Sequence, residues 1–493
     1  MNVAIIGAGA AGLMAASFIK DEYEIHIFDH NEKIGKKLFI TGKGRCNITN
    51  SCDIQELIEN INTNKYFCYS PFYDFTNEQV INFFNSNGLR TKVERGNRVF
   101  PQSDKSSDVI KVFEKILKDK NVHLHLNEQV NKIYKSNKFY LTTNRDEYGF
   151  DKVIIACGGK SYPNTGSDGS LYSQITKLGH TIHEMKPGLS AIILKENVEE
   201  LEGVSLKNVG LKCYLNKKLI YDDIGEMIFT RKGISGPLVL TLSSILCNKN
   251  GDIKISIDLK PGLTDQKLDD RILRDFSENQ NKTIENAISK ITIKKLILPI
   301  LKSANINPNK KVNEITKFER DNLRKIIKSF DLTYVSNEKL DYAIISVGGV
   351  DVNEIDPSTM ESKIVKDLYF CGEVIDVDGF TGGFNLQFAF STGYLAGINI
   401  WKKSSTKTNI NCMMKLMNIS KTRISIFYWY LHLKLWRKFW MINWLIQIKI
   451  FWSHQECSEK MTMIMFILNW LIMTYILLLL MDQVDLVNQQ FVN

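Results

Sequence analysis

Cysteine pairs and zinc-type histidine motifs are missing from this sequence. Its nine cysteines include no Cys-x-x-Cys pair, and its eight histidines show no ligand spacing and no cluster. Structural zinc sites need such spacings, and secreted disulfide scaffolds need dense cysteines. We therefore expect no metal site, and reduced thiols of the kind found in the cytoplasm.

A signal peptide and a strongly charged body are missing as well. The first residues contain no basic segment, and their apolar run leads straight into glycines, so we expect a cytoplasmic protein. From Lys402 onward there are 11 Lys/Arg and 4 Asp/Glu, which gives this segment +7 of the total +9. The other residues carry only +2, so overall charge indicates no partner.

Glycine, alanine and proline are absent from residues 402–493. All seven tryptophans lie at Trp401 or later, and nine of the 14 methionines lie between residues 413 and 481. Natural domains of this length need Gly and Pro for turns and caps. One interpretation is a membrane anchor at 461–481, which is uncharged and long enough to span a bilayer. The other is an A/T-rich stretch translated in the wrong frame.

A codon test favours the frame-shift interpretation. The codons of Met481 and Asp482 force a glycine codon, GGA, in the shifted frame. With permitted third bases, that frame can continue as GSSGSGKSTICK, which contains the phosphate-binding pattern G-x-x-x-x-G-K-[ST] and resembles the start of a nucleotide kinase. We expect 402–493 to be a foreign tail without chemistry, and sequencing of the DNA tests this.

A glycine-rich turn follows the first apolar stretch. Residues 3–6 read as a strand, the pattern Gly7-x-Gly9-x-x-Gly12 follows, and an Ala-rich helix comes next. In dinucleotide-binding folds the three glycines allow a tight turn, close approach of a pyrophosphate, and close packing of helix on strand. A second strand at 24–28 ends at Asp29, where an acid is expected to bind the ribose hydroxyls.

A second half-site near residue 372 distinguishes FAD from NAD. A strand at 367–371 leads into Gly372 and Glu373, and Asp376 follows. A Gly-rich loop then opens a helix near Asn385 and Gln387. We expect Asp376 to hold a ribityl hydroxyl and the helix N-terminus to face the flavin.

A basic glycine-rich loop spans residues 35–50 and contains Lys37, Gly44, Arg45 and Cys46. Its glycines and cations suit a nucleotide. Because a neighbouring cation lowers a thiol's pKa, Cys46 beside Arg45 is our candidate proton donor. The alternative is that Cys46 only packs beside the cofactor. Val130 and Gly158 are further candidate cofactor positions.

The remaining pattern indicates an interrupted nucleotide-binding domain. Short alternating runs predict an inserted β-barrel, and charged stretches with apolar residues at helical spacing predict helices. We expect an α/β fold with these parts: a Rossmann-like FAD-binding domain at 1–188 and 336–401, a barrel-like domain at 189–262, a helical insertion at 263–335, and the tail.

Residues 1 to about 400 resemble the BaiN/YhiN-type NAD(P)/FAD-dependent oxidoreductases, through the motifs above together with residues 94–103, 229–237 and 343–350. Asp29 is a mild departure, because the family usually has Glu there. The resemblance implies FAD as cofactor, NAD(P)H as reductant, and the fold just described. It implies either reduction of a uridine in large-subunit ribosomal RNA or reduction of an unsaturated steroid.

Both reactions add a hydride to a polarised C=C bond. We favour the rRNA uridine as substrate and expect RNA contacts in the Lys- and Arg-rich region 271–328. A small-molecule enone reductase or amine oxidase, and a non-catalytic flavin-holding redox sensor or RNA-binding module, are the alternatives.

Overall fold

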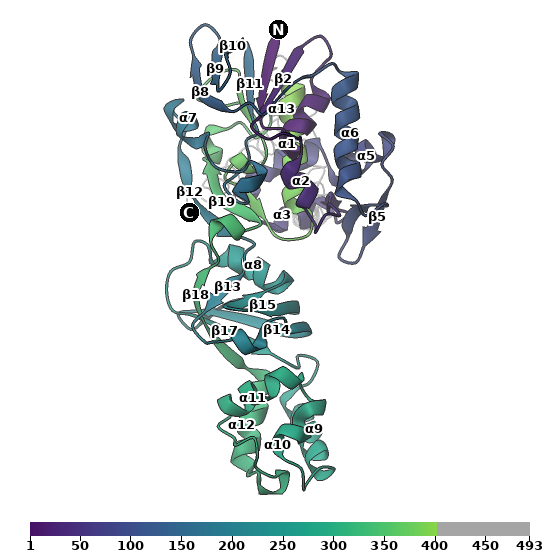
Figure 1. Ribbon diagram of the computed structural model, residues 1–493, viewed down its shortest axis with the longest axis vertical. Helices are drawn as coiled ribbons and strands as arrows, with labels where there is room; N and C mark the ends of the chain where they lie inside the picture. The colour runs from purple at the N-terminus through teal and green to yellow at the C-terminus, as the bar shows by residue number, and fades with distance from the viewer. Residues whose placement is uncertain (402–493) are drawn as a thin grey trace, which may run out of the picture. The chain divides into compact units, whose positions relative to one another are not determined.

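The computed structural model describes residues 1–401, and the expectations for 402–493 lie outside this part of the chain. A five-stranded parallel sheet forms its first layer, in the order β20-β11-β1-β2-β7. Figure 1 labels two of its strands, β2 and β11, close to the N-terminus. These strands are β1 (Asn2–Ile6), β2 (Glu24–Asp29), β7 (His123–Leu126), β11 (Lys152–Ile155) and β20 (Leu368–Phe370). β1 and β11 are almost wholly buried, as expected for parallel strands covered on both faces.

Two helices from opposite ends of the described chain pack closely together. Helix α1 (Ala10–Phe18) follows β1, and α13 (Phe384–Asn399) is the last helix described. A Cβ atom added at Gly393 would lie 2.4 Å from the carbonyl oxygen of Ala11, and one at Gly397 would lie 2.4 Å from that of Ala15. The two glycines therefore let the helix backbones approach closely.

Further helices and four small sheets complete this first part. Its other α-helices are α2 (Lys36–Ile40), α3 (Ile54–Glu59), α4 (Tyr69–Asp74), α5 (Asn77–Ser86), α6 (Ser106–Asp119) and α7 (Tyr172–Lys177). Its other strands are β3 (Thr49–Asn50), β4 (Ile61–Thr63), β5 (Thr91–Glu94), β6 (Arg98–Pro101), β8 (Val130–Lys135), β9 (Phe139–Thr143), β10 (Glu147–Phe150), β12 (Ile182–Gly188), β19 (Ile345–Val350) and β21 (Asp378–Gly379). Strands β8, β9 and β10 form an antiparallel meander, and β12 pairs with β19.

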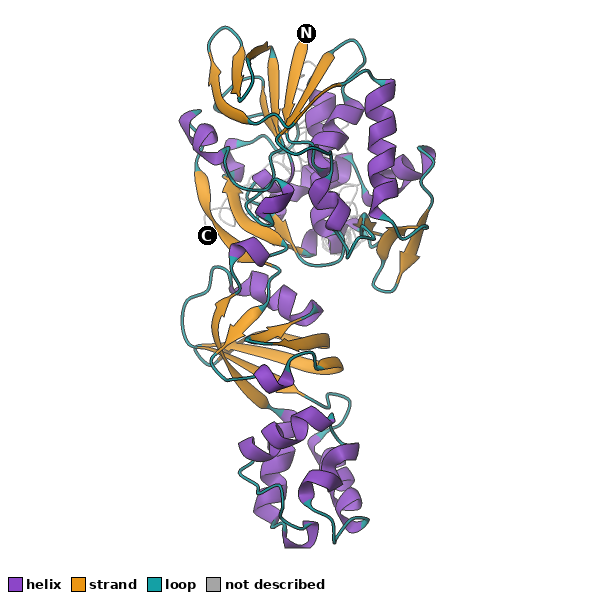
Figure 2. Cartoon of the chain, in the orientation of Figure 1, coloured by secondary structure: helices purple, strands orange, loops and turns teal. Residues whose placement is uncertain are grey.

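A closed six-stranded barrel is inserted between β12 and β19, in the order β13-β16-β15-β14-β17-β18 (Figure 2). Its strands are β13 (Ile192–Leu194), β14 (Ser205–Leu215), β15 (Lys218–Thr230), β16 (Gly233–Ser235), β17 (Ile253–Asp258) and β18 (Phe330–Asn337), and helix α8 (Pro237–Leu246) follows β16. Inward residues such as Leu211, Phe229 and Ile255 are buried and form a core of their own.

The helical segment interrupts the barrel between β17 and β18. It consists of α9 (Asp265–Ser277), α10 (Ile284–Ala287), α11 (Lys294–Ser303) and α12 (Lys317–Lys328). We expected helix up to residue 335, but β18 returns to the barrel at Phe330. The physical reason is alternation: Phe330 and Leu332 are buried and Asp331 between them is exposed, which is the period of a strand.

The expected fold class is therefore confirmed: a Rossmann-like sheet interrupted by a β-barrel and a small helical part. Among residues 1–401, no helix combines the length and the apolar character that crossing a bilayer requires.

Candidate functional site

A cavity of about 1140 Å³ lies where the glycine-rich turns of the parallel sheet meet the barrel. Its size is at the upper end of ligand pockets. Predicted site residues on its wall are Gly7, Gly9, Asp29, Lys37, Arg45, Val130, Gly158, Gly372, Glu373 and Asn385. The structure therefore brings together residues from both ends of the described chain.

The three glycines of the first turn occupy three different environments. A Cβ atom at Gly7 would lie 2.3 Å from the carbonyl oxygen of Ala156, and one at Gly12 would lie 2.1 Å from that of Gly7. A Cβ at Gly9 would meet nothing within 4 Å. Gly7 and Gly12 are thus needed for packing, whereas Gly9 leaves open space at the cavity wall, as a pyrophosphate site requires.

Two helix N-termini border the same cavity. Gly9 precedes α1 and Gly383 precedes α13, and neither helix has a side-chain cap or an acidic residue in its first turn. Their free backbone N–H groups and positive dipole ends favour anionic groups, such as phosphates or a reduced flavin.

The Asp29 carboxylate stands at the end of β2 and already accepts backbone hydrogen bonds. One oxygen accepts from the N–H of Ala8 at 2.8 Å, and the other accepts from the N–H of Asn31 at 2.9 Å. These bonds tie the first turn to β2 and hold the carboxylate at the cavity wall. Asp29 thus occupies the place in which the fold holds a ribose-binding acid.

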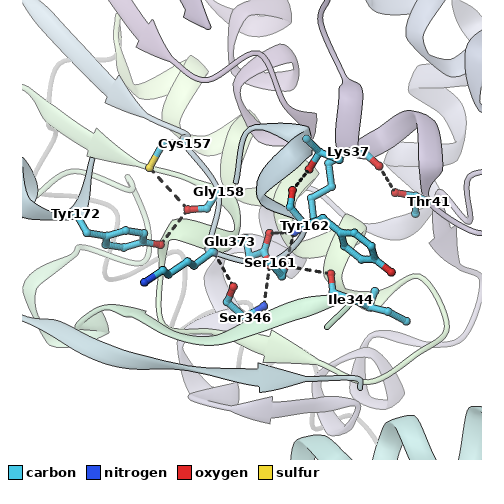
Figure 3. Close-up of polar contacts among 12 residues, drawn as sticks. Lys37, Thr41, Cys157, Gly158, Ser161, Tyr162, Tyr172, Ile344, Ser346 and Glu373 are labelled. Carbon is cyan, nitrogen blue, oxygen red and sulfur yellow. Dashed lines mark hydrogen bonds and ion pairs between the residues drawn. The ribbon is translucent and has the colours of Figure 1, made fainter. Parts of the chain in front are cut away.

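Lys37 and Glu373 form an ion pair on the cavity wall (Figure 3). The Lys37 Nζ atom lies 2.8 Å from Glu373 Oε2 and donates to Ser161 Oγ at 2.7 Å. The other carboxylate oxygen of Glu373 accepts from the Ser346 N–H at 2.9 Å. The network joins the basic loop, the β11 loop, β19 and the C-terminal half-site, so it fixes the position of both charges.

The other residues of the C-terminal half-site have different roles from those expected. Glu373, rather than Asp376, is the acid that lines the cavity, because Asp376 is buried and accepts a hydrogen bond from Asn64 at 3.1 Å. Asn385 bonds both backbone groups of Gly379 and so shapes the loop. Gln387 is fully buried, where it accepts a hydrogen bond from Thr49 and donates one to the backbone of Phe75. It therefore holds α13 in place without lining the cavity.

Cys46 does not match the environment that we expected. It is fully buried, and this burial raises the pKa of its thiol to about 12. The Arg45 guanidinium instead binds Glu94 and Asp104, each at 2.5 Å. The expected lowering of the Cys46 pKa is therefore wrong. Burial agrees with a packing role, but the structure does not place Cys46 beside the cavity, so packing against the cofactor stays a prediction. Gly44, like Cys46, is not among the residues of the cavity wall.

The barrel contributes residues that the sequence analysis did not single out. Lys207, Asn208, Ile224 and Glu226 of β14 and β15 line the cavity. Ile224 is 61% exposed, an unusual position for a large apolar side chain within a strand. This exposure is the only feature that distinguishes Ile224 from other apolar strand residues. The alternation of residues along the sequence does not show which apolar side chains are exposed.

Three histidines that we expected to be isolated meet on the sheet. The register of β2 and β7 sets His26 opposite His123 and Phe28 opposite His125. The His26 Nδ1 and His125 Nε2 atoms are 2.9 Å apart. The expectation of no histidine cluster is therefore wrong, because parallel pairing joins residues about a hundred positions apart.

The residues around the cavity fit FAD. The open space at Gly9, the uncapped N-terminus of α1 and the Asp29 carboxylate suit the adenosine diphosphate half, and the uncapped N-terminus of α13 in the far half-site suits the isoalloxazine. A cavity of this kind is typical of a flavin-dependent oxidoreductase of the Rossmann class.

Comparisons with known proteins agree with this class. The family model described as HI0933-like protein Rossmann domain matches residues 1–399. A 3-dehydro-bile acid Δ4,6-reductase of Clostridium scindens is 31% identical over 80% of this chain and 98% of its own length. A ribosomal RNA dihydrouridine synthase of Escherichia coli is 28% identical over 79% of this chain and 95% of its own length.

Solved structures resemble this chain more distantly. A 3-ketosteroid-Δ4-(5α)-dehydrogenase from Rhodococcus jostii RHA1 is 12% identical, covers 81% of this chain and 96% of its own, and gives a TM-score of 0.43. The chain belongs to the HI0933-like family and is an FAD-dependent oxidoreductase.

Proposed function

We propose that this enzyme uses NAD(P)H to reduce a conjugated C=C bond, and that its substrate is a uridine of large-subunit ribosomal RNA, which becomes dihydrouridine. The two dihydrouridine synthases among its relatives support the substrate, and the cytoplasm is where this RNA would be modified. The observation that carries the proposal is the distribution of charge.

Positive charge concentrates in the helical segment. Residues 264–330 contain 15 Lys/Arg and 9 Asp/Glu, a net charge of +6, whereas all residues before Lys402 together carry only +2. The arginines Arg271, Arg320 and Arg324 are paired with aspartates. Eight exposed lysines of this segment have no ion pair among residues 1–401: Lys267, Lys282, Lys294, Lys295, Lys302, Lys311, Lys317 and Lys325. Such lysines suit RNA phosphates.

The cavity wall also carries exposed cations. Lys43, Arg95, Arg98 and Lys207 line it, and none has an ion pair within the described part of the chain. Two exposed acids, Glu56 and Glu226, line the cavity too, so positive charge covers only part of its wall. A flipped-out uridine next to phosphates would meet both a basic rim and an apolar interior.

The chemistry that bound FAD supplies is hydride transfer from NAD(P)H to the conjugated bond. The residues of the chain do the rest: Gly9 and the N-terminus of α1 bind the phosphates, the N-terminus of α13 faces the flavin ring, and Asp29 orients the ribose. The second carbon of the reduced bond needs a proton. With Cys46 buried, we propose that Lys37 holds this proton at Nζ, where Glu373 and Ser161 position it.

A small-molecule enone reductase is the second candidate. The bile acid reductase is the more similar of the two kinds of relative, at 31% identity, and Ile224, Leu240 and Phe380 give the cavity wall an apolar side. An amine oxidase or a non-catalytic flavin-holding module has no specific observation in its favour.

Deletion of the gene, followed by mass mapping of ribosomal RNA, tests the proposal. We expect one uridine of the large-subunit RNA to lose its 2 Da of added hydrogen in the deletion strain, and a plasmid copy of the gene to restore dihydrouridine. Unchanged dihydrouridine would overturn the RNA substrate. Bleaching of the purified flavoprotein by NADPH and by NADH, followed by reoxidation with a steroid enone, would then test the second candidate.

A further inference from the structure

The histidine cluster lies on the strands β2 and β7, away from the chemistry proposed above. Glu24 and His26 are two residues apart and therefore on the same face of β2, and His123 pairs with His26 across the strands. The potential ligand atoms of these three side chains all lie within 4.8 Å of one another.

The distances suit a small metal ion. Glu24 Oε1 lies 3.2 Å from His26 Nε2 and 3.7 Å from His123 Nε2. In a tetrahedral zinc site with bonds of ~2.0–2.1 Å, the ligand atoms lie ~3.4 Å apart. The atoms are thus close enough for one ion, although the His26 and His123 rings are stacked with their centroids 4.6 Å apart. The exposed His123 and Glu24 side chains would therefore have to rotate to face the metal.

A second argument comes from counting ring protons along a chain of contacts. Beyond His26, the Nε2 atom of His125 lies 2.9 Å from His26 Nδ1, and the Nδ1 atom of His125 lies 3.4 Å from the carboxylate of Glu128. With the Glu24 contact, this makes three contacts between two imidazoles and two carboxylates. Each contact needs one proton between its two atoms, but two neutral imidazoles supply only two ring protons, so one contact lacks a proton.

The buried end of this chain determines where the two protons go. Glu128 is 1% exposed, so both of its carboxylate oxygens need a donor. The Thr143 hydroxyl donates to Oε1 at 2.8 Å, and His125 Nδ1–H faces Oε2 at 3.4 Å. His125 Nε2 is then an acceptor, and His26 Nδ1–H donates to it. His26 Nε2 is left without a proton, facing the carboxylate of Glu24.

We propose that Glu24, His26 and His123 form a zinc-binding site, with water as the fourth ligand. Three potential ligand atoms gather there, and a cation would take the place of the missing proton once the exposed His123 ring, now stacked on His26 at 4.6 Å, turns toward it. His125 and Glu128 form the supporting shell that fixes the tautomer of a metal-binding histidine. Two histidines and one carboxylate are a common zinc ligand set. The ion would join β2 to the edge strand β7, from which the chain continues to Glu128 and Val130 at the cavity.

Zinc titration of the purified FAD-loaded full chain tests this site. After treatment with a chelator, we expect the protein to bind one Zn²⁺ in isothermal titration calorimetry and to melt at a higher temperature with the metal. Glu24→Gln and His123→Gln should each weaken binding at least about tenfold. Both positions are exposed, so these variants should fold, which unchanged flavin absorbance and an unchanged melting temperature without metal would show.

His183→Gln is the matched control. His183 is also an exposed histidine near a carboxylate, that of Asp351, but it belongs to no such cluster. This variant should bind zinc like the unmodified chain. If His123→Gln binds as tightly as the unmodified chain, or if crystals grown with zinc show no anomalous peak among the three side chains, the site does not exist. These outcomes are independent of activity and leave the proposed reaction untouched.

Discussion

At the scale of single residues, Gly9 and Gly12 provide a matched pair. A methyl group at Gly9 would enter open space at the cavity, whereas one at Gly12 would meet the carbonyl oxygen of Gly7 at 2.1 Å. We expect Gly9→Ala to fold normally and to lose most of its bound FAD. Gly12→Ala should instead lower the stability of the protein by about 1–3 kcal/mol, as overpacking does. Flavin absorbance and thermal unfolding separate the two effects, and full FAD content in Gly9→Ala would contradict the assignment.

Asp378 predicts a pH-dependent stability. Its side chain is buried, and this burial raises its pKa from 3.8 to about 6. Between about pH 4 and 6 the folded state holds a proton that the unfolded state has released, and above pH 6 the folded state has to bury the ionised carboxylate. A destabilising contribution is therefore fully present above pH 6 and disappears as the pH falls toward 4. Asp378→Asn removes the charge and should raise stability at pH 8 by up to about 3 kcal/mol. At pH 4 the variant should melt like the unmodified chain, and an equal gain at both pH values would refute the explanation.

Single residues also show where sequence reasoning stops. The roles of Gly7, Gly9 and Gly12 follow from their spacing, because the backbone geometry of this turn requires it. Cys46 could not be predicted in the same way. Its pKa is raised by burial, which no local pattern shows. The Arg45 side chain binds Glu94 and Asp104 instead, about fifty residues further along the chain.

At the scale of elements, the Lys37–Glu373 pair connects α2 with the turn that follows β20. Lys37→Met removes the proposed proton donor, so a plasmid copy of this variant should restore at least about tenfold less dihydrouridine than the unmodified gene. Lys37→Arg keeps the charge and should restore more. Both variants should be assayed with FAD in excess. Full restoration by Lys37→Met would exclude Lys37 as the donor.

We predict that exposed lysines of helices α11 and α12 bind RNA phosphates. Reversing three of their exposed lysines, with Lys294→Glu, Lys302→Glu and Lys317→Glu, should weaken binding of a ribosomal RNA fragment. It should also reduce the slope of log affinity against log salt by up to about 3, one for each lost phosphate contact. The control reverses Lys33, Lys115 and Lys118, three exposed lysines outside this segment. An equal loss in both triple variants would mean that binding is nonspecific.

The elements themselves were largely predictable. Residues 24–28 alternate between polar and apolar side chains, and residues 152–155 form a short apolar run that leads to Gly158. Both patterns predict strands, and both segments are strands of the parallel sheet. β18 was missed because its strand pattern follows a long helical segment directly. Its partners, β13 and β17, lie far away in the sequence, and only their pairing closes the barrel.

At the scale of the whole molecule, the described fold reaches its end with α13. The family match ends at residue 399, and Trp401 still contacts the body through a hydrogen bond from its indole to the Phe18 carbonyl oxygen. A chain that stops after Trp401 should therefore keep its FAD and melt within about 2 °C of the full chain. Loss of flavin from this shorter chain would show that residues 402–493 belong to the working enzyme.

The close packing of α1 against α13 also has a consequence during synthesis. The ribosome makes α1 among the first twenty residues, but the glycines that fit against it, Gly393 and Gly397, emerge some 380 residues later. At ~5–20 residues per second, the apolar face of α1 waits for tens of seconds without its partner. The nascent chain therefore has to be kept from aggregating during that time, and it cannot complete its cofactor site until translation of the family region is nearly finished.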